Sequence, residues 1–312
     1  MADDTPKNTY PSPDYEGDPA ALPVGDYKDW LAPFAAGPDL LIGLDVDGTI
    51  LYHDTSLSPR VRDAVHAHIE AGTHIVIATG RGVQGTQLAL EALGIDDGIA
   101  VVSNGALIIS IGEADYGLPA TNFNGGVAST NVPVRLLRAH TFNPREEIEK
   151  ITTGLPDAVI AVESLSGPTR ISGPFPEGEL FDDALLVPAS DLVAPDTTRV
   201  TIRAPHMTAM EMLGAIEALG LQGVEYAVGW SAWMDLAPHG INKAVGLQEV
   251  ADILGTSSSI TVGDSGNDCE MLEWGDVGVA MGNSRDYVAS FADTMAPHVD
   301  DDGLAAVLEE LL

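Results

Sequence analysis

Two carboxylates stand two residues apart at the end of an apolar run, in the segment from Leu41 to Thr49. A short apolar run of this kind is typical of a buried strand in a parallel sheet. Residues two apart start from the same face of extended chain, so Asp45 and Asp47 are predicted to lie close together. Like charges at that spacing favour one protonated carboxyl, which suits a base or nucleophile paired with an acid. Gly48 permits the sharp turn that follows.

Polar groups also end three other predicted strands. They are Thr79 with Gly80, Asn104, and Asp264 with Asn267 and Asp268. Lys243 stands at a helix start before the last of these strands. Clustered carboxylates in an acidic chain need a cation, and ligands that are all oxygen indicate Mg²⁺. Thr79 with adjoining amides, and Lys243 as a compact positive charge, suit a phosphoryl group, which an ionised Asp can also accept covalently.

The elements that must position these residues alternate between strand and helix. Ser58 and Pro59 are predicted to begin a helix that ends at Gly72. Further helices are predicted at 83–93 and 243–254, between strands at 74–78, 99–103, 259–263 and 277–281. This alternation predicts an α/β fold with a doubly wound parallel sheet, whose ligand sites lie at the carboxyl ends of its strands.

The alternation is interrupted in the middle of the chain, which predicts an inserted α+β domain. We predict a mobile N-terminal arm at 1–38, then a core domain at 39–140 and 237–312, with the insertion at 141–236. A short helix near Tyr27 to Phe34 is expected to dock Trp30, and Glu113 to Asn131 is predicted to form an exposed insertion or hairpin loop.

Composition restricts the class of partner. The chain has 312 residues, with 14 lysines and arginines against 47 acidic residues, a formal charge of -33. That field repels nucleic acid and anionic lipid, so neither is an expected partner. Cys269 is the single cysteine, which excludes an intrachain disulfide. No signal peptide or run of about 18 apolar residues is present, so we expect a cytoplasmic protein without a membrane span.

Five ordered motifs carry a resemblance to a known family. They are Asp45-Val46-Asp47-Gly48-Thr49, Thr79-Gly80-Arg81, Ser103-Asn104-Gly105-Ala106, Gly240-Ile241-Asn242-Lys243 and Gly263-Asp264-Ser265-Gly266-Asn267-Asp268. With them the chain resembles a haloacid dehalogenase-superfamily phosphatase of the Cof-type subgroup (subfamily IIB), in which an α+β cap of the C2B type is inserted into the core. The segment Val279 to Asn283 and the late Asp302-Gly303-Leu304 also fit that subgroup.

The resemblance implies a Mg²⁺-dependent phosphatase that acts on a small phosphorylated metabolite, with sugar phosphates favoured. Asp45 would attack phosphorus, and Asp47 would protonate the leaving oxygen and then activate water. Asp45, Asp264 and the backbone carbonyl of Asp47 would hold Mg²⁺, with Asp268 in support. The phosphoryl oxygens would be bound by Thr79, Gly80, Lys243 and Asn267.

Other readings of the same residues remain open. A sugar phosphomutase would use the same two aspartates and return the phosphate to its substrate. A phospho-accepting receiver module also uses Asp, Thr, Lys and Mg²⁺, but has no need for an acid at Asp47; a catalytically silent binding protein is a third alternative. Thr79 and Asp268 are also typical helix caps, a surface ion pair is expected for Arg81, and packing is expected for Trp230 and Trp233.

Overall fold

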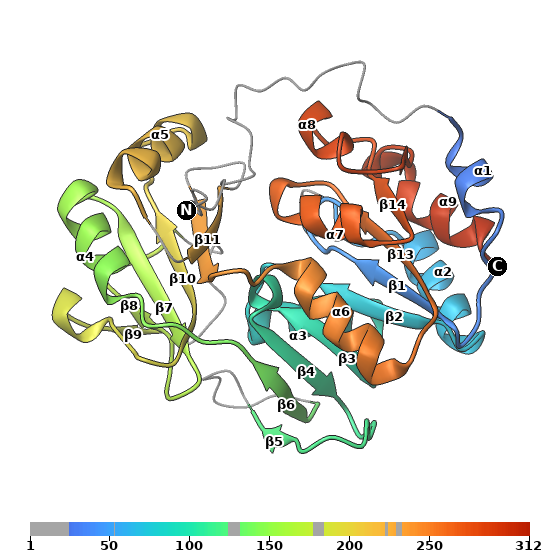
Figure 1. The fold of residues 1–312 in the computed structure, drawn as a ribbon, viewed down its shortest axis with the longest axis horizontal. Coiled ribbons are helices and arrows are strands. Elements are labelled where there is room, and N and C mark those ends of the chain that lie inside the picture. Colours follow the sequence, from blue (N-terminus) through green and yellow to red (C-terminus); the bar gives the residue numbers. More distant parts are fainter. Residues whose placement is uncertain (1–24, 53, 124–131, 177–183, 222–223, 229–232) are drawn as a thin grey trace, which may run out of the picture.

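The structure, a computed structural model, describes residues 25–52, 54–123, 132–176, 184–221, 224–228 and 233–312 (Figure 1). The helices are α1 Tyr27–Leu31, α2 Pro59–Glu70, α3 Val83–Leu93, α4 Arg145–Gly154, α5 Ala209–Leu219, α6 Lys243–Leu254, α7 Cys269–Trp274, α8 Asp286–Ala289 and α9 Gly303–Glu310. Short 3-10 helices are η2 Ser103–Gly105, η3 Ala189–Asp191, η4 Gly266–Asp268 and η5 Val299–Asp301.

The strands form two separate sheets. Those of the larger sheet are β1 Leu40–Leu44, β2 His74–Ala78, β3 Gly98–Val102, β4 Leu107–Ile111, β5 Thr121–Asn122, β6 Val134–Ala139, β13 Ser258–Gly263, β14 Val277–Ala280 and β15 Thr294–Met295. Those of the smaller sheet are β7 Val159–Ser164, β8 Arg170–Ile171, β9 Leu185–Leu186, β10 Thr197–Arg203, β11 Val224–Val228 and β12 Trp233–Pro238.

The larger sheet has the order β15-β14-β13-β1-β2-β3-β4-β6-β5, and it is parallel from β15 to β3. Every residue of β1 is buried, because this central strand is covered on both faces. Leu44 at the end of β1 pairs with Ile77 of β2 and Val262 of β13. The three strands therefore end side by side, and the residues that follow them meet at one edge.

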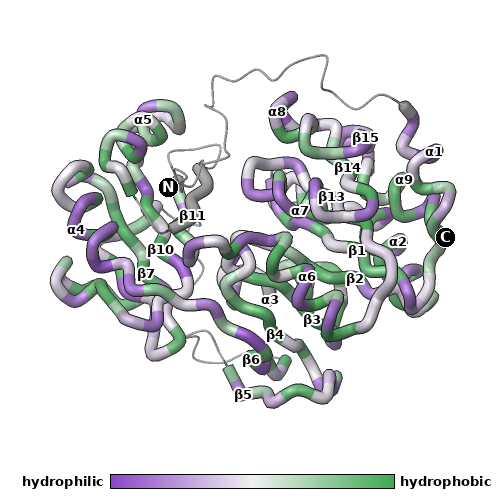
Figure 2. Tube along the Cα trace, in the orientation of Figure 1, coloured by the Kyte–Doolittle hydropathy of each residue, from purple (hydrophilic) through white to green (hydrophobic). Residues whose placement is uncertain are grey.

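Helices cover both faces of this sheet, as predicted for a doubly wound fold. Ile42 and Leu44 point into the core that α2, α3 and α9 close, whereas Leu41 points into the core under α6 and α7. The α2 helix begins as its sequence predicts, with Ser58 accepting a hydrogen bond from the Arg60 amide and Pro59 as the first residue. Figure 2 shows that β3 and β4 are largely hydrophobic, and the residues of β4 are all buried.

The smaller sheet belongs to the inserted segment and packs its own core. Its order is β11-β12-β10-β7-β8-β9, antiparallel except between β8 and β9. Val200 and Ile202 of β10 face the apolar cluster under α4 and α5, whereas Arg199 and Thr201 alternate with them on the opposite face. In Figure 1 the two helices lie on the outer side of this sheet, away from the larger domain. We call the inserted segment the cap and the remainder the core domain; the exact domain limits stay predictions.

Residues 25–38 pack on the core domain, although we placed them in the arm. The predicted short helix is α1, but the expectation that it docks Trp30 is wrong: Leu31 is fully buried, whereas Trp30 is 40% exposed. The amide of Ala36 also donates to the carbonyl of Leu311. The rest of the predicted arm, residues 1–24, lies outside the described residues.

Two antiparallel strands, β4 and β6, extend the core sheet beyond β3 and were not among the predicted elements. The predicted loop from Glu113 to Asn131 contains the short exposed strand β5, and its residues 124–131 lie outside the described part. Among the described residues, no helix combines the length and apolar character needed to cross a membrane.

Candidate active site

Asp45 and Asp47 follow β1 and take different positions. Asp45 is buried, and its amide donates to the carbonyl of Val262 at the end of β13. The carboxylate of Asp47 is exposed and paired with Arg81, whose Nε lies 2.9 Å from Oδ2. Arg81 therefore forms the expected ion pair, but its own side chain is only 12% exposed, so it does not lie on the surface as expected. The metal ligand predicted from Asp47 is its main-chain carbonyl rather than its carboxylate. The metal-binding role of Asp47 therefore stays a prediction.

Gly48 is required where β1 turns away from the site. It has a φ of +84°, in the left-handed region that favours glycine. A Cβ at this position would lie 2.4 Å from Oδ2 of Asp264. Any side chain here would displace that carboxylate, so Gly48 allows the turn and the close approach together.

Asp264 and Asp268 enter the site from the end of β13 and are both fully buried. One oxygen of Asp268, Oδ2, accepts from the amides of Asp264 and Ser265 at 3.0 and 2.9 Å. Asp268 stands at the N-cap position of α7, but its side chain does not cap that helix. It shapes the β13–α7 loop and thereby fixes Asp264.

Lys243, the first residue of α6, is fully buried between two of the aspartates. Its Nζ donates to Oδ1 of Asp45 at 2.6 Å and to Oδ1 of Asp268 at 2.7 Å. Burial alone would lower the pKa of Lys243, but the carboxylates of Asp268 and Asp45 outweigh it and raise that pKa above its ordinary value. The lysine is thus a charged bridge that joins α6 to both strand ends.

One lysine does not balance three buried aspartates. Asp45, Asp264 and Asp268 each offer an oxygen, and these oxygens lie within 4.8 Å of one another. Burial, then the charge of Asp268, raises the pKa of Asp45 to about 7. Burial, then the charges of Asp45 and Asp268, raises the pKa of Asp264 to about 9. A bound cation would offset this excess negative charge.

The donor set fits a hard divalent cation. Oδ1 of Asp264 is buried and has no hydrogen-bond partner among the residues that the structure describes. A buried carboxylate oxygen without a partner is costly, and a metal ion would satisfy it. Carboxylate oxygens at this spacing are ligands that Mg²⁺ and similar cations accept.

Thr79 and Gly80 lie beside this cluster at the end of β2. Thr79 is buried, and its Oγ1 accepts from the amide of Arg81 at 3.1 Å. Gly82, rather than Thr79, is the N-cap residue of α3, so Thr79 is not a helix cap. A Cβ on Gly80 would lie 3.0 Å from Oδ1 of Asn104 and 3.2 Å from Nδ2 of Asn267. The structure thus brings the predicted residues of β2 and β13 together.

Asn104 and Asn283 position this group; the sequence places Asn104 at a strand end but predicts a role for neither asparagine. Nδ2 of Asn267 donates to Oδ1 of Asn104 at 2.9 Å, and Asn104 is held with a φ of +54°. Asn283 donates to the carbonyl of Gly48 and to Oδ2 of Asp264, at 2.9 and 3.1 Å. Both follow predicted strands, which is the signal that singled out Asn104 and could have identified Asn283.

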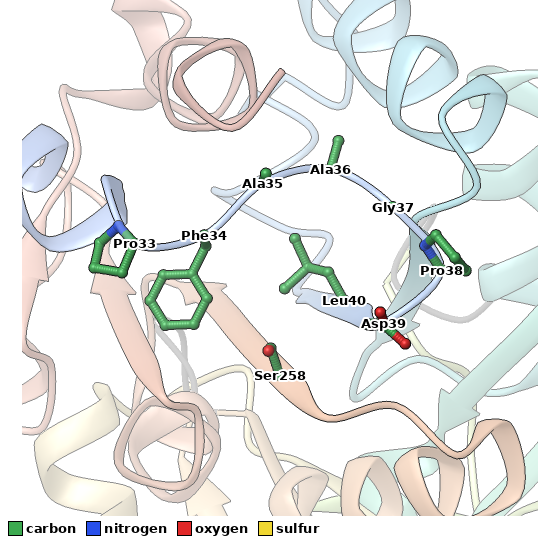
Figure 3. Close-up of a pocket in the computed structure, with 9 residues that line it drawn as sticks. All are labelled: Pro33, Phe34, Ala35, Ala36, Gly37, Pro38, Asp39, Leu40 and Ser258. Atoms are coloured by element: carbon green, nitrogen blue, oxygen red, sulfur yellow. The ribbon is translucent and has the colours of Figure 1, made fainter.

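A separate pocket lies at the opposite edge of the core sheet (Figure 3). It is lined by the segment from Pro33 to Leu40 and by Ser258. Leu40 and Ser258 are the first residues of β1 and β13, whereas the aspartates follow the last residues of these strands. This pocket is therefore remote from the carboxylate cluster.

Comparison with known proteins agrees with this geometry. A family model described as haloacid dehalogenase-like hydrolase matches residues 42–131 and 196–308. The chain is 25% identical over 278 residues to the 5-amino-6-(5-phospho-D-ribitylamino)uracil phosphatase YitU of Bacillus subtilis, covering 86% of this chain and 96% of that protein. It is 27% identical over 271 residues to a phosphoglycolate phosphatase of Natronomonas pharaonis, covering 86% and 96%.

Solved structures share the whole fold, including the cap. A haloacid dehalogenase-like hydrolase from B. subtilis superposes with a TM-score of 0.69 at 20% identity, covering 87% of this chain and 99% of that one. A sugar phosphatase of haloacid dehalogenase subclass IIB superposes with a TM-score of 0.67 at 19% identity, covering 86% and 97%. The resemblance predicted from the motifs is confirmed, because the family model covers more than half of the chain. The chain belongs to the haloacid dehalogenase-like hydrolase family.

Proposed function

We propose that this hydrolase is a Mg²⁺-dependent phosphatase of small phosphorylated metabolites, sugar phosphates among them, and that it works through an aspartyl-phosphate on Asp45. The observation that carries the proposal is the buried cluster of Asp45, Asp264 and Asp268 with Lys243 between two of its members. Phosphoryl transfer needs mainly positioning and charge compensation, which this cluster supplies. The relatives described above act on different small phosphorylated compounds, which supports the substrate class.

The first half of the reaction transfers the phosphoryl group to the enzyme. A carboxylate oxygen of Asp45 forms a bond to phosphorus, and the bond from phosphorus to the leaving oxygen breaks. Asp47, exposed at the mouth of the site, gives that oxygen its proton. Because Asp47 is paired with Arg81 in this structure, we infer that the pair separates when Asp47 carries the proton.

The second half returns the enzyme to its starting state. Asp47 takes a proton from water, the water oxygen attacks phosphorus, and the bond to Asp45 breaks to release orthophosphate. Lys243, Thr79, the Gly80 amide and Asn267 are assigned to the phosphoryl oxygens. Bound Mg²⁺, held by Asp45, Asp264 and the carbonyl of Asp47, would neutralise charge on the phosphoryl group.

The test is a screen of the purified chain against phosphorylated metabolites in the presence of Mg²⁺. The quantity measured is the release of orthophosphate. Asp45→Asn is the inactive control, and Asp63→Asn, on the exposed face of α2, is the matched control for an unrelated aspartate. We expect orthophosphate release by the wild type and Asp63→Asn, and none by Asp45→Asn. An isomeric phosphate ester in place of orthophosphate would contradict a phosphatase and indicate a mutase.

A further inference from the structure

A buried ion pair of the cap reaches into the core domain. Glu163 of β7 and Arg199 of β10 stand directly opposite each other in the antiparallel register. Nε of Arg199 donates to Oε1 of Glu163 at 2.9 Å, and Nη2 donates to the same oxygen. Nη1 donates to the main-chain carbonyl of Gly80. One guanidinium therefore joins two strands of the cap to the loop between β2 and α3.

The cap holds this guanidinium from a second side. Asp235 of β12 places Oδ2 3.8 Å from Nη1 of Arg199. Its other oxygen, Oδ1, accepts from Thr201 at 2.7 Å. The side chains of Arg199 and Glu163 are only 7% and 11% exposed. A charged group so little exposed, and paired on the cap side by two carboxylates, has a fixed position rather than a freely moving one.

The loop from Thr79 to Gly82, here called the β2–α3 loop, approaches the pair closely. A Cβ on Gly82 would lie 2.8 Å from Oε2 of Glu163 and 3.3 Å from Nη2 of Arg199. The φ of Gly82 is -72°, which any residue can adopt. Glycine is therefore needed at position 82 because the ion pair lies so close, and not because of an unusual backbone conformation.

We propose that Arg199, oriented by Glu163, is a positioning residue that fixes the β2–α3 loop for phosphoryl binding when the cap is closed on the core. The inference rests on the proposed function, in which Thr79 and Gly80 of this loop bind the phosphoryl oxygens. In the core domain, Arg199 contacts the carbonyl of Gly80. Gly80 is the residue whose amide faces the phosphoryl group in the proposed function. Loss of the contact therefore weakens phosphate binding by the same factor whatever the leaving group.

The experiment measures the inhibition constant of orthophosphate, together with kcat and KM for p-nitrophenyl phosphate and for a sugar phosphate, in the presence of Mg²⁺. An inhibition constant does not depend on the fraction of folded enzyme, so a purely structural defect leaves it unchanged. Arg199→Met removes the contact from the cap side. Gly82→Ala disturbs it from the core side and leaves all charged groups of the cap in place, which guards against misfolding of the first variant.

Arg170→Met is the matched control. Arg170 lies in β8 of the same sheet, and its guanidinium donates to the carbonyls of Asp191 and Val193 inside the cap. We expect the inhibition constant of orthophosphate to rise about tenfold in Arg199→Met and in Gly82→Ala, as for a lost hydrogen bond to a charged donor. Both substrates should lose kcat/KM by the same factor, and Arg199→Lys, which keeps a charged donor, should recover part of the loss.

Two outcomes would overturn the proposal. The first is that the inhibition constants of Arg199→Met and Gly82→Ala both equal that of Arg170→Met. The second is a loss of kcat/KM for only one of the two substrates, which would make Arg199 a leaving-group contact. Hydrogen exchange of residues 79–86 provides a readout without turnover, and it should be faster in Arg199→Met than in Arg170→Met. If the wild type turns over no phosphate ester, the proposed function fails, whereas equal exchange in the two variants rejects the contact itself.

Discussion

Lys243 offsets part of the negative charge of the site, because its ammonium group lies between the buried carboxylates of Asp45 and Asp268. A lysine at the first position of a helix is disfavoured by the helix dipole, so its place at the start of α6 needs compensation. Asp45 and Asp268 provide it. The same lysine is therefore expected to stabilise the fold, in addition to the phosphoryl-binding role proposed for it.

We expect Lys243→Met to lower the free energy of unfolding by about 3–5 kcal/mol, since it leaves two buried carboxylates without their partner. The measurement is urea unfolding in EDTA, which removes metal ions that could compensate. The matched control is Lys150→Met, which removes a partly exposed lysine paired with Glu146 within α4 and should cost at most about 1 kcal/mol. Equal losses in the two variants would show that Lys243 is not a structural bridge.

Asp264 and Asp268 should differ in what they contribute, although both are buried aspartates of one loop. Oδ1 of Asp264 lacks a hydrogen-bond partner among the described residues, whereas both oxygens of Asp268 are bonded. We expect Asp264→Ala to raise the Mg²⁺ concentration needed for half-maximal activity steeply, by about tenfold or more for a lost metal ligand. Asp268→Ala should raise it less and should lower the midpoint of thermal unfolding more.

Titration of activity with Mg²⁺ after EDTA treatment, combined with differential scanning fluorimetry, separates the two effects. Ca²⁺, which is larger and takes more ligands, should support activity poorly. The assignment is wrong if both variants need the same Mg²⁺ concentration. Full activity of the wild type in EDTA would exclude the proposed metal altogether.

At the scale of elements, the sequence was most informative where local signals agree. The Ser58-Pro59 start predicted α2, and the apolar strands that end in Asp45, Thr79 and Asp264 predicted one edge of a parallel sheet. These signals are local in the chain, and the parallel topology brings them together without further information. The candidate site was predictable for the same reason.

The elements that were missed depend on contacts across the chain. Strands β4 and β6 extend the sheet by antiparallel pairing, and only their neighbours show that they belong to the core domain. Leu31 rather than Trp30 docks α1, because the packing face of a five-residue helix is set by its partner. The pairing of Arg199 with Glu163 joins residues 36 apart and likewise has no local signature.

His68 links three elements and makes their packing sensitive to pH. Its Nε2 bonds the carbonyl of Leu308 in α9, and Nδ1 bonds the hydroxyl of Thr73, which accepts from the amide of Gly37. Burial lowers the pKa of His68 from its ordinary value of 6.5. The unfolded chain thus binds the proton more readily than the folded one, so stability is full above pH 6.5 and falls as the pH drops below it.

The comparison is between wild type and His68→Gln, in which an amide replaces the titrating ring. We expect the stability advantage of the wild type, measured by urea unfolding, to be constant above pH 6.5. Below that pH it should shrink by at most about 1.4 kcal/mol per unit. An advantage that does not change between pH 8 and pH 5 would show that His68 does not titrate in this way.

At the scale of the whole molecule, we expect the chemistry and the selection of the substrate to be divided between the core domain and the cap. All of the predicted catalytic, phosphate and metal residues lie in the core, whereas the polar face of the cap sheet carries Arg199, which contacts Gly80. Trp233 lies on that same face, because its indole donates to Asp235 two residues further along β12. We therefore expect this face of the cap to exclude water and to contact the leaving group.

We expect Trp233→Ala to change the ratio of kcat/KM between two phosphate esters with different leaving groups by about tenfold. Trp274→Ala is the matched control, because Trp274 lies in α7 of the core and its indole donates to Gln248. Equal loss for both substrates would mean that Trp233 has the packing role considered above. Its predicted companion Trp230 lies outside the described residues.

The central claim is that Asp45 carries the phosphoryl group. Asp47→Asn should slow both halves of the reaction, because the amide can neither give the leaving oxygen its proton nor take a proton from water, and the slowed second half lets the phospho-enzyme be trapped. The measurement is peptide mass spectrometry of Asp47→Asn quenched in acid during turnover. We expect phosphate on Asp45, in the peptide that contains β1. Phosphate on any other residue would contradict the claim.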